Sequence, residues 1–142
     1  MQAQPPEPQQ PVHGVDAQLA RPGCLSYLEI PAIDPRKSAA FYAALLGWKI
    51  MNADSDQPKF SDPSGNLIGR WIKGRPAAKE PGILPYIYVH GIDDIAARAS
   101  AHGGELLEAP RPEGNLRVAR LRDPAGNVIG IWQAMPPSPS KP

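Results

Sequence analysis

A ten-residue motif occurs twice in the chain, and this repeat constrains the fold more than any other feature. The first copy is DPSGNLIGRW at residues 62–71 and the second is DPAGNVIGIW at residues 123–132, so seven of ten positions are identical. Asp-Pro and Gly-Asn are typical of a tight turn, and the apolar run that follows is typical of a strand. Self-similarity at a fixed offset indicates a duplicated unit. We therefore expect two similar modules, each ending in a hairpin.

A strand and a helix are predicted before the first copy. Residues 25–30 are rich in strand formers, and Pro31 should end the strand. Asp34 is a suitable N-cap for a helix, and Gly47 is a suitable residue to end it.

The same order of elements is predicted before the second copy. The sequence favours a strand over 83–90, then a helix capped by Asp93 or Asp94 and ended by the glycines at 103–104. Each half then reads as a strand, a helix and further strands. This pattern predicts an α+β fold of two βαβββ modules.

Charge and hydrophobicity exclude several classes of protein. The 142 residues carry 15 Lys and Arg against 14 Asp and Glu, so the formal net charge is only +1. This balance argues against nucleic acid as a partner, and no run approaches the roughly 20 apolar residues that span a membrane. Cys24 is the single cysteine, so an internal disulfide is excluded. We expect a cytoplasmic protein.

Proline is concentrated at the two ends of the sequence. We expect a flexible Pro/Gln-rich tail over 1–22 and a second flexible tail over 136–142, because neither has a hydrophobic pattern. An alternative for the first tail is an arm that lies on a partner subunit. The folded domain is expected over 23–135, with one module at about 25–74 and the other at about 83–133.

Three segments make the chain resemble the vicinal oxygen chelate superfamily, which includes glyoxalase I, bleomycin-resistance proteins and extradiol dioxygenases. They are EIPAIDPRKSAAFYAALLGW, YVHGIDDIAARASAHGG and LRDPAGNVIGIW. The resemblance implies paired βαβββ modules that form an open, curled mixed β-sheet, a half-barrel with helices on the outside, around a cavity. It also implies a homodimer.

The metal ligands of this superfamily are not matched in the sequence. The resemblance places its four ligand positions at Tyr27, Gly69, Leu84 and Gly130, with Tyr86 or Tyr88 replacing Leu84 if the register shifts. None of these residues is a His, Glu, Asp or Cys. We therefore expect no metal cofactor.

Aromatic residues could line the cavity in place of a metal. If Gly69 and Gly130 face inward, then Trp71 and Trp132 do so too, because residues two apart on a strand share a face. Tyr27 and Tyr86 or Tyr88 would join them. Aromatic walls suit a flat organic ligand, although the same rings could instead fill the barrel.

Glu29 is the one acid expected on the inner face of a strand. Desolvation among aromatic rings would raise its pKa and suit it to general acid or base catalysis. Alternatives are a salt bridge with Arg120, or a non-standard metal site with His90. A group of arginines in the second half could favour an anionic ligand, or could form a solvated strand edge: Arg111, Arg117, Arg120 and Arg122.

Three functions remain open from the sequence. The first is a metal-free protein that binds an aromatic or amphipathic organic molecule. The second is an enzyme of glyoxalase, isomerase or dioxygenase type that uses Tyr27, Glu29 and His90. The third is a structural or regulatory module with a filled interior. The candidate ligand-binding residues are Tyr27, Glu29, Gly69, Trp71, Tyr86, Tyr88, Arg120, Gly130 and Trp132.

Overall fold

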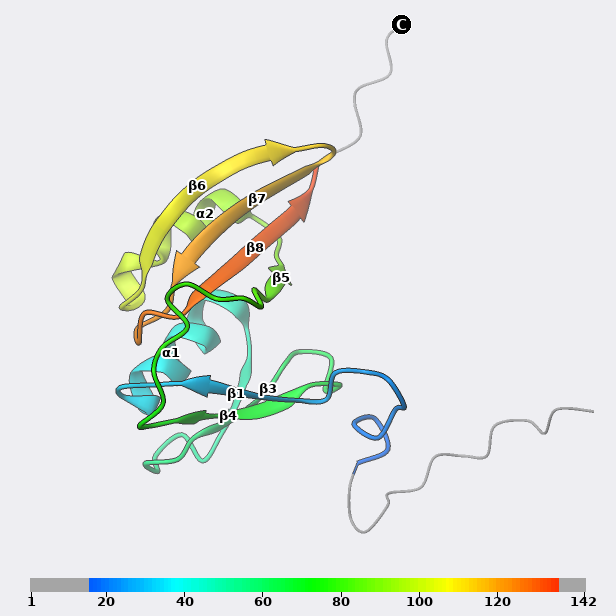
Figure 1. The fold of residues 1–142 in the computed structure, drawn as a ribbon, viewed down its shortest axis with the longest axis vertical. Coiled ribbons are helices and arrows are strands. Elements are labelled where there is room, and N and C mark those ends of the chain that lie inside the picture. The colour runs from blue at the N-terminus through cyan, green and yellow to red at the C-terminus, as the bar shows by residue number, and fades with distance from the viewer. Residues whose placement is uncertain (1–15, 136–142) are drawn as a thin grey trace, which may run out of the picture.

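The structure is a computed structural model that describes residues 16–135, in which two βαβββ modules follow one another along the chain (Figure 1). Most of the predicted first tail and the whole of the second lie outside the described residues. In residues 16–135 no helix is long and apolar enough to cross a membrane.

The first module is a four-stranded mixed sheet with one helix. Its strands lie in the order β1-β4-β3-β2, with β1 parallel to β4 and the other pairs antiparallel. Its elements are β1 (Tyr27–Pro31), α1 (Pro35–Leu46), β2 (Lys49–Met51), β3 (Lys59–Ser61) and β4 (Ile68–Ile72).

The ends of α1 are the ones that the sequence predicts. The Asp34 carboxylate accepts hydrogen bonds from the backbone N–H groups of Arg36 and Lys37, which have no partner inside the helix. Gly47 ends the helix with a φ of 72°, a left-handed conformation that glycine adopts without steric cost.

The second module repeats this topology with longer strands. Its sheet has the order β5-β8-β7-β6, with β5 parallel to β8. Its elements are β5 (Tyr86–Tyr88), α2 (Ile92–Arg98), the 3₁₀ helix η1 (Ser100–His102), β6 (Glu105–Glu113), β7 (Leu116–Arg122) and β8 (Val128–Ala134).

Two predictions for the start of the second module are wrong in detail. The strand expected over 83–90 is only three residues long, since Pro85 has no N–H group to donate to a neighbouring strand. Helix α2 is capped by Gly91 in a left-handed conformation, and Asp93 and Asp94 lie inside its first turn. Acidic side chains there still interact favourably with the helix dipole.

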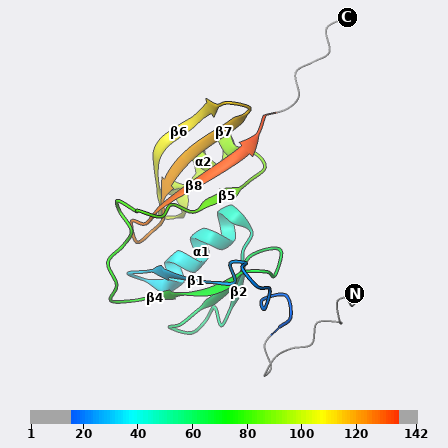
Figure 2. The same ribbon diagram turned by 45° about the vertical axis from the view of Figure 1, so that its right-hand side comes forward.

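Both sheets contribute to one hydrophobic core, and α1 lies between the first sheet and the second module (Figures 1 and 2). Phe41 and Tyr42 of α1 are almost fully buried, as are Phe60 of the first sheet and Ile131 of the second. Each sheet therefore has one face in the core and one face that no helix of residues 16–135 covers. The predicted α+β fold of paired βαβββ modules with curled sheets is confirmed, and the sheets do not close into a barrel.

A buried polar cluster joins the modules at the second hairpin. Asp123 accepts hydrogen bonds from the Tyr42 hydroxyl and the Asn127 amide, and Asn127 also donates to the carbonyl of Pro31. The Asn127 side-chain oxygen accepts from the N–H of Ala78, in the segment between the modules. The second copy of the repeated motif thus holds the two modules in a fixed relation.

Candidate functional site

The two copies of the repeated motif form hairpins whose loops differ by one residue. In the first hairpin the N–H of Asp62 donates to the carbonyl of Leu67, five residues later. In the second the N–H of Asp123 donates to Asn127, four residues later. Because successive strand residues point to opposite faces, this difference reverses the facing of the two copies.

Trp71 and Trp132 consequently lie on different kinds of surface. Trp71 is 3% exposed and packs against Phe60 and Tyr42 in the core, with ring centroids 4.9 and 5.8 Å apart. Trp132 lies on the helix-free face of the second sheet, beside Tyr88. The expected sharing of one inward face by both tryptophans therefore differs from the structure, since the longer first loop turns Trp71 into the core.

Gly69 and Gly130 each leave space for an aromatic ring. A Cβ atom on Gly69 would collide with the Phe60 ring and with the carbonyl of Leu28, so this glycine permits core packing. A Cβ atom on Gly130 would collide with the ring of Tyr86 from the neighbouring strand. Gly130 therefore allows an aromatic ring to lie flat on the helix-free face.

Backbone pairing identifies which residues of the two modules are equivalent. The N–H of Ala32 donates to Ile72, and the N–H of Val89 donates to Trp132. Ile72 thus matches Trp132, and two residues earlier Arg70 matches Gly130. A cationic guanidinium and a glycine provide no metal ligand, and neither does an aliphatic side chain at position 84, so these positions do not fit the metal of the superfamily.

The helix-free face of the second sheet carries a group of aromatic side chains, here called the aromatic surface: Tyr86, Tyr88 and Trp132, laid around Gly130. Tyr88 and Trp132 pack edge to face with centroids 4.6 Å apart. Tyr86 and Tyr88 remain 42% and 44% exposed. Large aromatic side chains exposed together on one face are typical of an interaction site.

Strand register places charged residues beside the aromatic surface in regular rows. One row runs Tyr86, Gly130, Arg120, Glu108 across the four strands. Arg120 Nε lies 3.6 Å from Glu108 Oε2. The pKa of Arg120 is raised, first by the adjacent Tyr86 side chain and then by the Glu108 carboxylate. The role of Glu108 was missed from the sequence. Its place opposite Arg120 lies between two register shifts of the β6–β7 pair, and no local pattern indicates them.

Tyr27 and Glu29 lie on the helix-free face of the first sheet, and the structure does not bring them into the aromatic surface. Glu29 pairs with Arg70 at 2.8 Å and with Arg75 at 3.1 Å, so the suggested partner Arg120 is wrong. Hydrogen bonds from Arg70 and then Arg75 hold the pKa of Glu29 below its ordinary value. The expected increase in this pKa is also wrong, because two cations outweigh desolvation.

The suggested pairing of Glu29 with His90 finds no support in the side-chain contacts. The His90 ring lies edge to face against Tyr88, with centroids 5.3 Å apart, at the end of the second module's first strand. In residues 16–135 no group of three or more His, Cys, Asp or Glu side chains is placed to hold a metal ion.

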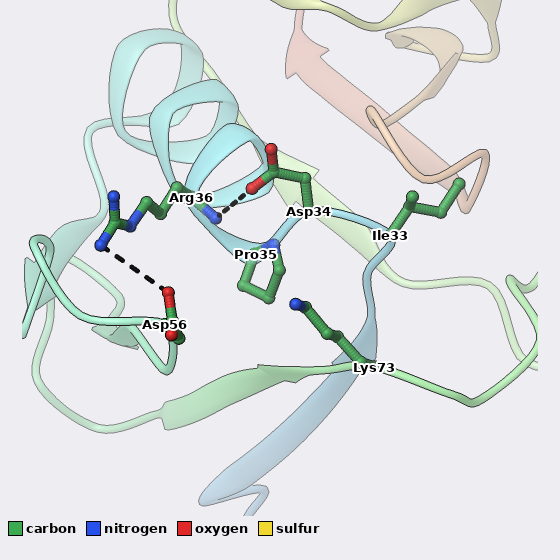
Figure 3. Close-up of a pocket in the computed structure, with 6 residues that line it drawn as sticks. All are labelled: Ile33, Asp34, Pro35, Arg36, Asp56 and Lys73. Atoms are coloured by element: carbon green, nitrogen blue, oxygen red, sulfur yellow. Dashed lines mark hydrogen bonds and ion pairs between the residues drawn. The ribbon is translucent and has the colours of Figure 1, made fainter.

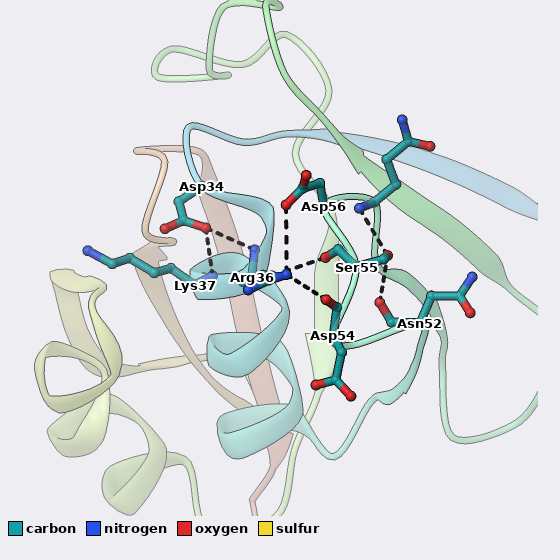
Figure 4. A network of polar contacts seen from close by, with 8 residues as sticks. Asp34, Arg36, Lys37, Asn52, Asp54, Ser55 and Asp56 are labelled. Carbon is teal, nitrogen blue, oxygen red and sulfur yellow. Dashed lines mark hydrogen bonds and ion pairs between the residues drawn. The ribbon is translucent and has the colours of Figure 1, made fainter.

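Two pockets lie apart from the aromatic surface. One, of about 350 Å³, lies at the start of α1, where Figure 3 shows Asp34, Lys73 and Asp56 around it. Beside it Arg36 donates to the backbone carbonyls of Asp54 and Ser55 and so attaches the 52–56 loop to α1 (Figure 4). The other, of about 470 Å³, lies beside the second hairpin and Lys79. The contacts of Arg36 beside the first pocket are structural, since they provide hydrogen-bond donors to the carbonyls of the 52–56 loop.

The chain matches known proteins over most of the described residues. It is 25% identical over 125 residues to "Putative glyoxylase CFP32" of Mycobacterium tuberculosis (strain CDC 1551 / Oshkosh), covering 80% of this chain and 47% of that protein. The chain thus spans about half the length of the curated relatives that it matches.

Solved structures share the same fold. A glyoxalase/bleomycin resistance protein from Albidiferax ferrireducens T118 is 26% identical, with 77% of this chain and 98% of that chain covered and a TM-score of 0.61. TnmS3, an antibiotic binding protein from Streptomyces sp. CB03234, is 21% identical, with 79% and 96% covered and a TM-score of 0.58.

The family itself follows from a family model rather than from these individual similarities. The model described as "Glyoxalase-like domain" matches residues 28–131, a range that runs from the first strand of one module into the last strand of the other. This chain therefore belongs to the glyoxalase-like domain family, as its repeated hairpins and paired modules indicate.

Proposed function

We propose that this protein binds an aromatic or amphipathic organic molecule on the aromatic surface of its second sheet, without a metal ion. The observation that carries the proposal is the edge-to-face pair of the exposed Tyr88 and the partly buried Trp132, beside which the exposed Tyr86 lies over Gly130. A ring system placed there would gain contact with several π faces at once. The description of TnmS3 as an antibiotic binding protein is consistent with such a task for this fold.

The residues at the superfamily's ligand positions support the metal-free part of the proposal. Arg70, the equivalent of Gly130 in the first module, would repel a cation, and Glu29 beside it is already neutralised by two arginines. A carboxylate engaged in this way gains little by ligating a metal or accepting a proton.

We also propose that the protein is a homodimer whose copies cover the helix-free faces of each other's first sheets. Large side chains are exposed on this face: Tyr27 is 50% and Met51 43% exposed. A second copy would bury this apolar area. Sedimentation should then give twice the 15.3 kDa mass of the chain, and a monomer at micromolar concentration would refute the dimer.

Binding is tested by thermal unfolding in the presence of a panel of planar aromatic compounds. A compound at 100 times its Kd should stabilise the protein by about 2.7 kcal/mol. Trp132→Ala should abolish the shift. Leu106→Ala is the control, because Leu106 is an accessible apolar residue of the same sheet, 39% exposed, that lies on the other face. A panel without any stabilising compound would contradict the proposal.

The metal question is tested separately by elemental analysis after incubation with Zn²⁺, Ni²⁺, Mn²⁺ and Fe²⁺. The proposal predicts less than one ion per chain after washing. One ion bound stoichiometrically, and lost in Glu29→Ala, would contradict it.

A further inference from the structure

The charges around the aromatic surface are arranged in layers. Strands β5 and β8 contribute only uncharged side chains to this face: Tyr86, Tyr88, Val128, Trp132 and Ala134, together with Gly130. The next strand, β7, places Arg120 opposite Gly130 and Arg122 opposite Val128. The carboxylates of Glu105 and Glu108 come one strand further out. A molecule lying on the aromatic surface therefore meets cations first.

Arg120 is held more loosely than Arg117 and Arg70. Arg117 donates two hydrogen bonds of 2.6 and 2.9 Å to Asp93, and Arg70 donates two of 2.8 and 3.0 Å to Glu29. Arg120 lies beside the Tyr86 side chain, and its ion pair with Glu108 is 3.6 Å long, which is longer than a hydrogen bond.

The donor atoms of Arg120 are accordingly not fully used. The Arg120 side chain as a whole remains 39% exposed, so an acceptor that arrives on this face can reach its guanidinium. The guanidinium plane also matches the two oxygens of a carboxylate.

We propose that the ligand of the aromatic surface is a planar aromatic acid, whose ring packs on Tyr88 and Trp132 and whose carboxylate binds Arg120. The inference rests on the proposed function and narrows its ligand class. Val118 lies directly opposite Trp132, and Arg120 is the diagonal neighbour. Diagonal neighbours on adjacent strands lie about 7–8 Å apart, so a ring over Trp132 places a carboxylate substituent within reach of the long Arg120 side chain. Glu108 positions the guanidinium from the outer side.

The inference is tested with two probes of the same shape, 2-naphthoate and 2-naphthamide, by isothermal titration calorimetry. Naphthoate should bind about 10- to 100-fold more tightly, the range expected for a charge-assisted hydrogen-bonded pair. Arg120→Gln should remove this difference by weakening naphthoate alone. Arg120→Lys should retain part of it, since an ammonium keeps the charge but lacks the planar pair of donors.

The matched control is Arg117→Gln, because Arg117 lies on the opposite face of the same strand and pairs with Asp93. It should leave both affinities unchanged. Thermal unfolding of each variant verifies that the fold is intact.

The outcomes separate this inference from the function on which it rests. Equal binding of naphthoate and naphthamide would overturn the inference and leave the proposed function in place. Failure of both probes, together with an unresponsive panel of aromatic compounds, would overturn both. If Arg120→Gln dissociates a dimer and leaves naphthoate affinity unchanged, Arg120 belongs to a subunit interface and the inference is wrong.

Discussion

The Tyr42 hydroxyl donates a 2.8 Å hydrogen bond to Oδ2 of Asp123, and this bond connects α1 of the first module to the hairpin of the second. Both residues are almost completely buried. Burial, and then the Asp123 carboxylate, raise the pKa of Tyr42 well above its ordinary value, so the phenol remains protonated and able to donate. The contact thus joins the modules through a neutral donor and a buried acceptor.

Removing this hydroxyl should destabilise the whole fold. Tyr42→Phe leaves Asp123 with one donor fewer in the interior, which should lower the free energy of unfolding by about 1–3 kcal/mol. Urea denaturation measures the change. Tyr27→Phe is the control, because Tyr27 is half exposed, and it should change stability by less than about 0.5 kcal/mol.

Substitution of the two motif tryptophans should affect different properties, stability for Trp71 and ligand binding for Trp132. Trp71→Ala should cost about 3–5 kcal/mol because it opens a cavity beside Phe60 and Tyr42. Trp132→Ala should cost less stability and should abolish binding of aromatic compounds. Denaturant unfolding and ligand-induced thermal shifts, measured on both variants, distinguish the two effects. Equal stability losses would indicate that Trp132 is also a core residue.

The two motif glycines should respond differently to an added methyl group. Gly69→Ala meets a backbone carbonyl and the Phe60 ring, neither of which can move away easily, so it should lower the thermal midpoint strongly. The atoms nearest to the methyl group of Gly130→Ala all belong to the half-exposed Tyr86 ring, which can rotate toward solvent. It should therefore retain most of the stability but weaken ligand binding. A stable Gly69→Ala variant would contradict this assignment.

Acid should weaken the protein partly through Glu29. Its pKa is lowered in the folded state, so its stabilising effect is complete above the ordinary value of 4.5 and is lost as the pH falls through the lower folded-state value. Glu29→Gln should thus show a shallower decrease in thermal midpoint below pH 4.5 than the wild-type protein. Parallel curves for the two proteins would show that the Arg70 and Arg75 contacts do not persist in solution.

The sequence predicted the elements well because their signals are local. Asp34 and Gly47 define the ends of α1 through their own backbone and side-chain chemistry, and the turn residues of both hairpins are explicit. The partners of Glu29 could not be predicted in the same way. Arg70 and Arg75 approach it through the parallel pairing of β1 and β4, a contact across about 40 residues of chain.

The facing of the repeated strands was open to prediction from their alternation. At corresponding positions the first copy has Arg70 and the second has Ile131. A charged residue on a half-buried strand favours the solvent side, so its neighbour Trp71 should be buried; the apolar Ile131 indicates the reverse for Trp132. The identity of seven of the ten motif residues obscured this difference.

The extra residue in the first hairpin loop also bears on how duplicated units can diverge. Two nearly identical segments here perform opposite tasks, one directing its indole to the interior and the other to the outside, although most of their residues are the same. A change of one residue in where pairing resumes after a turn exchanges the inside and outside of an entire strand in a single event, whereas point substitutions would have to replace its residues one at a time. A doubled gene can in this way acquire a recognition surface in one half while the other half keeps its scaffold.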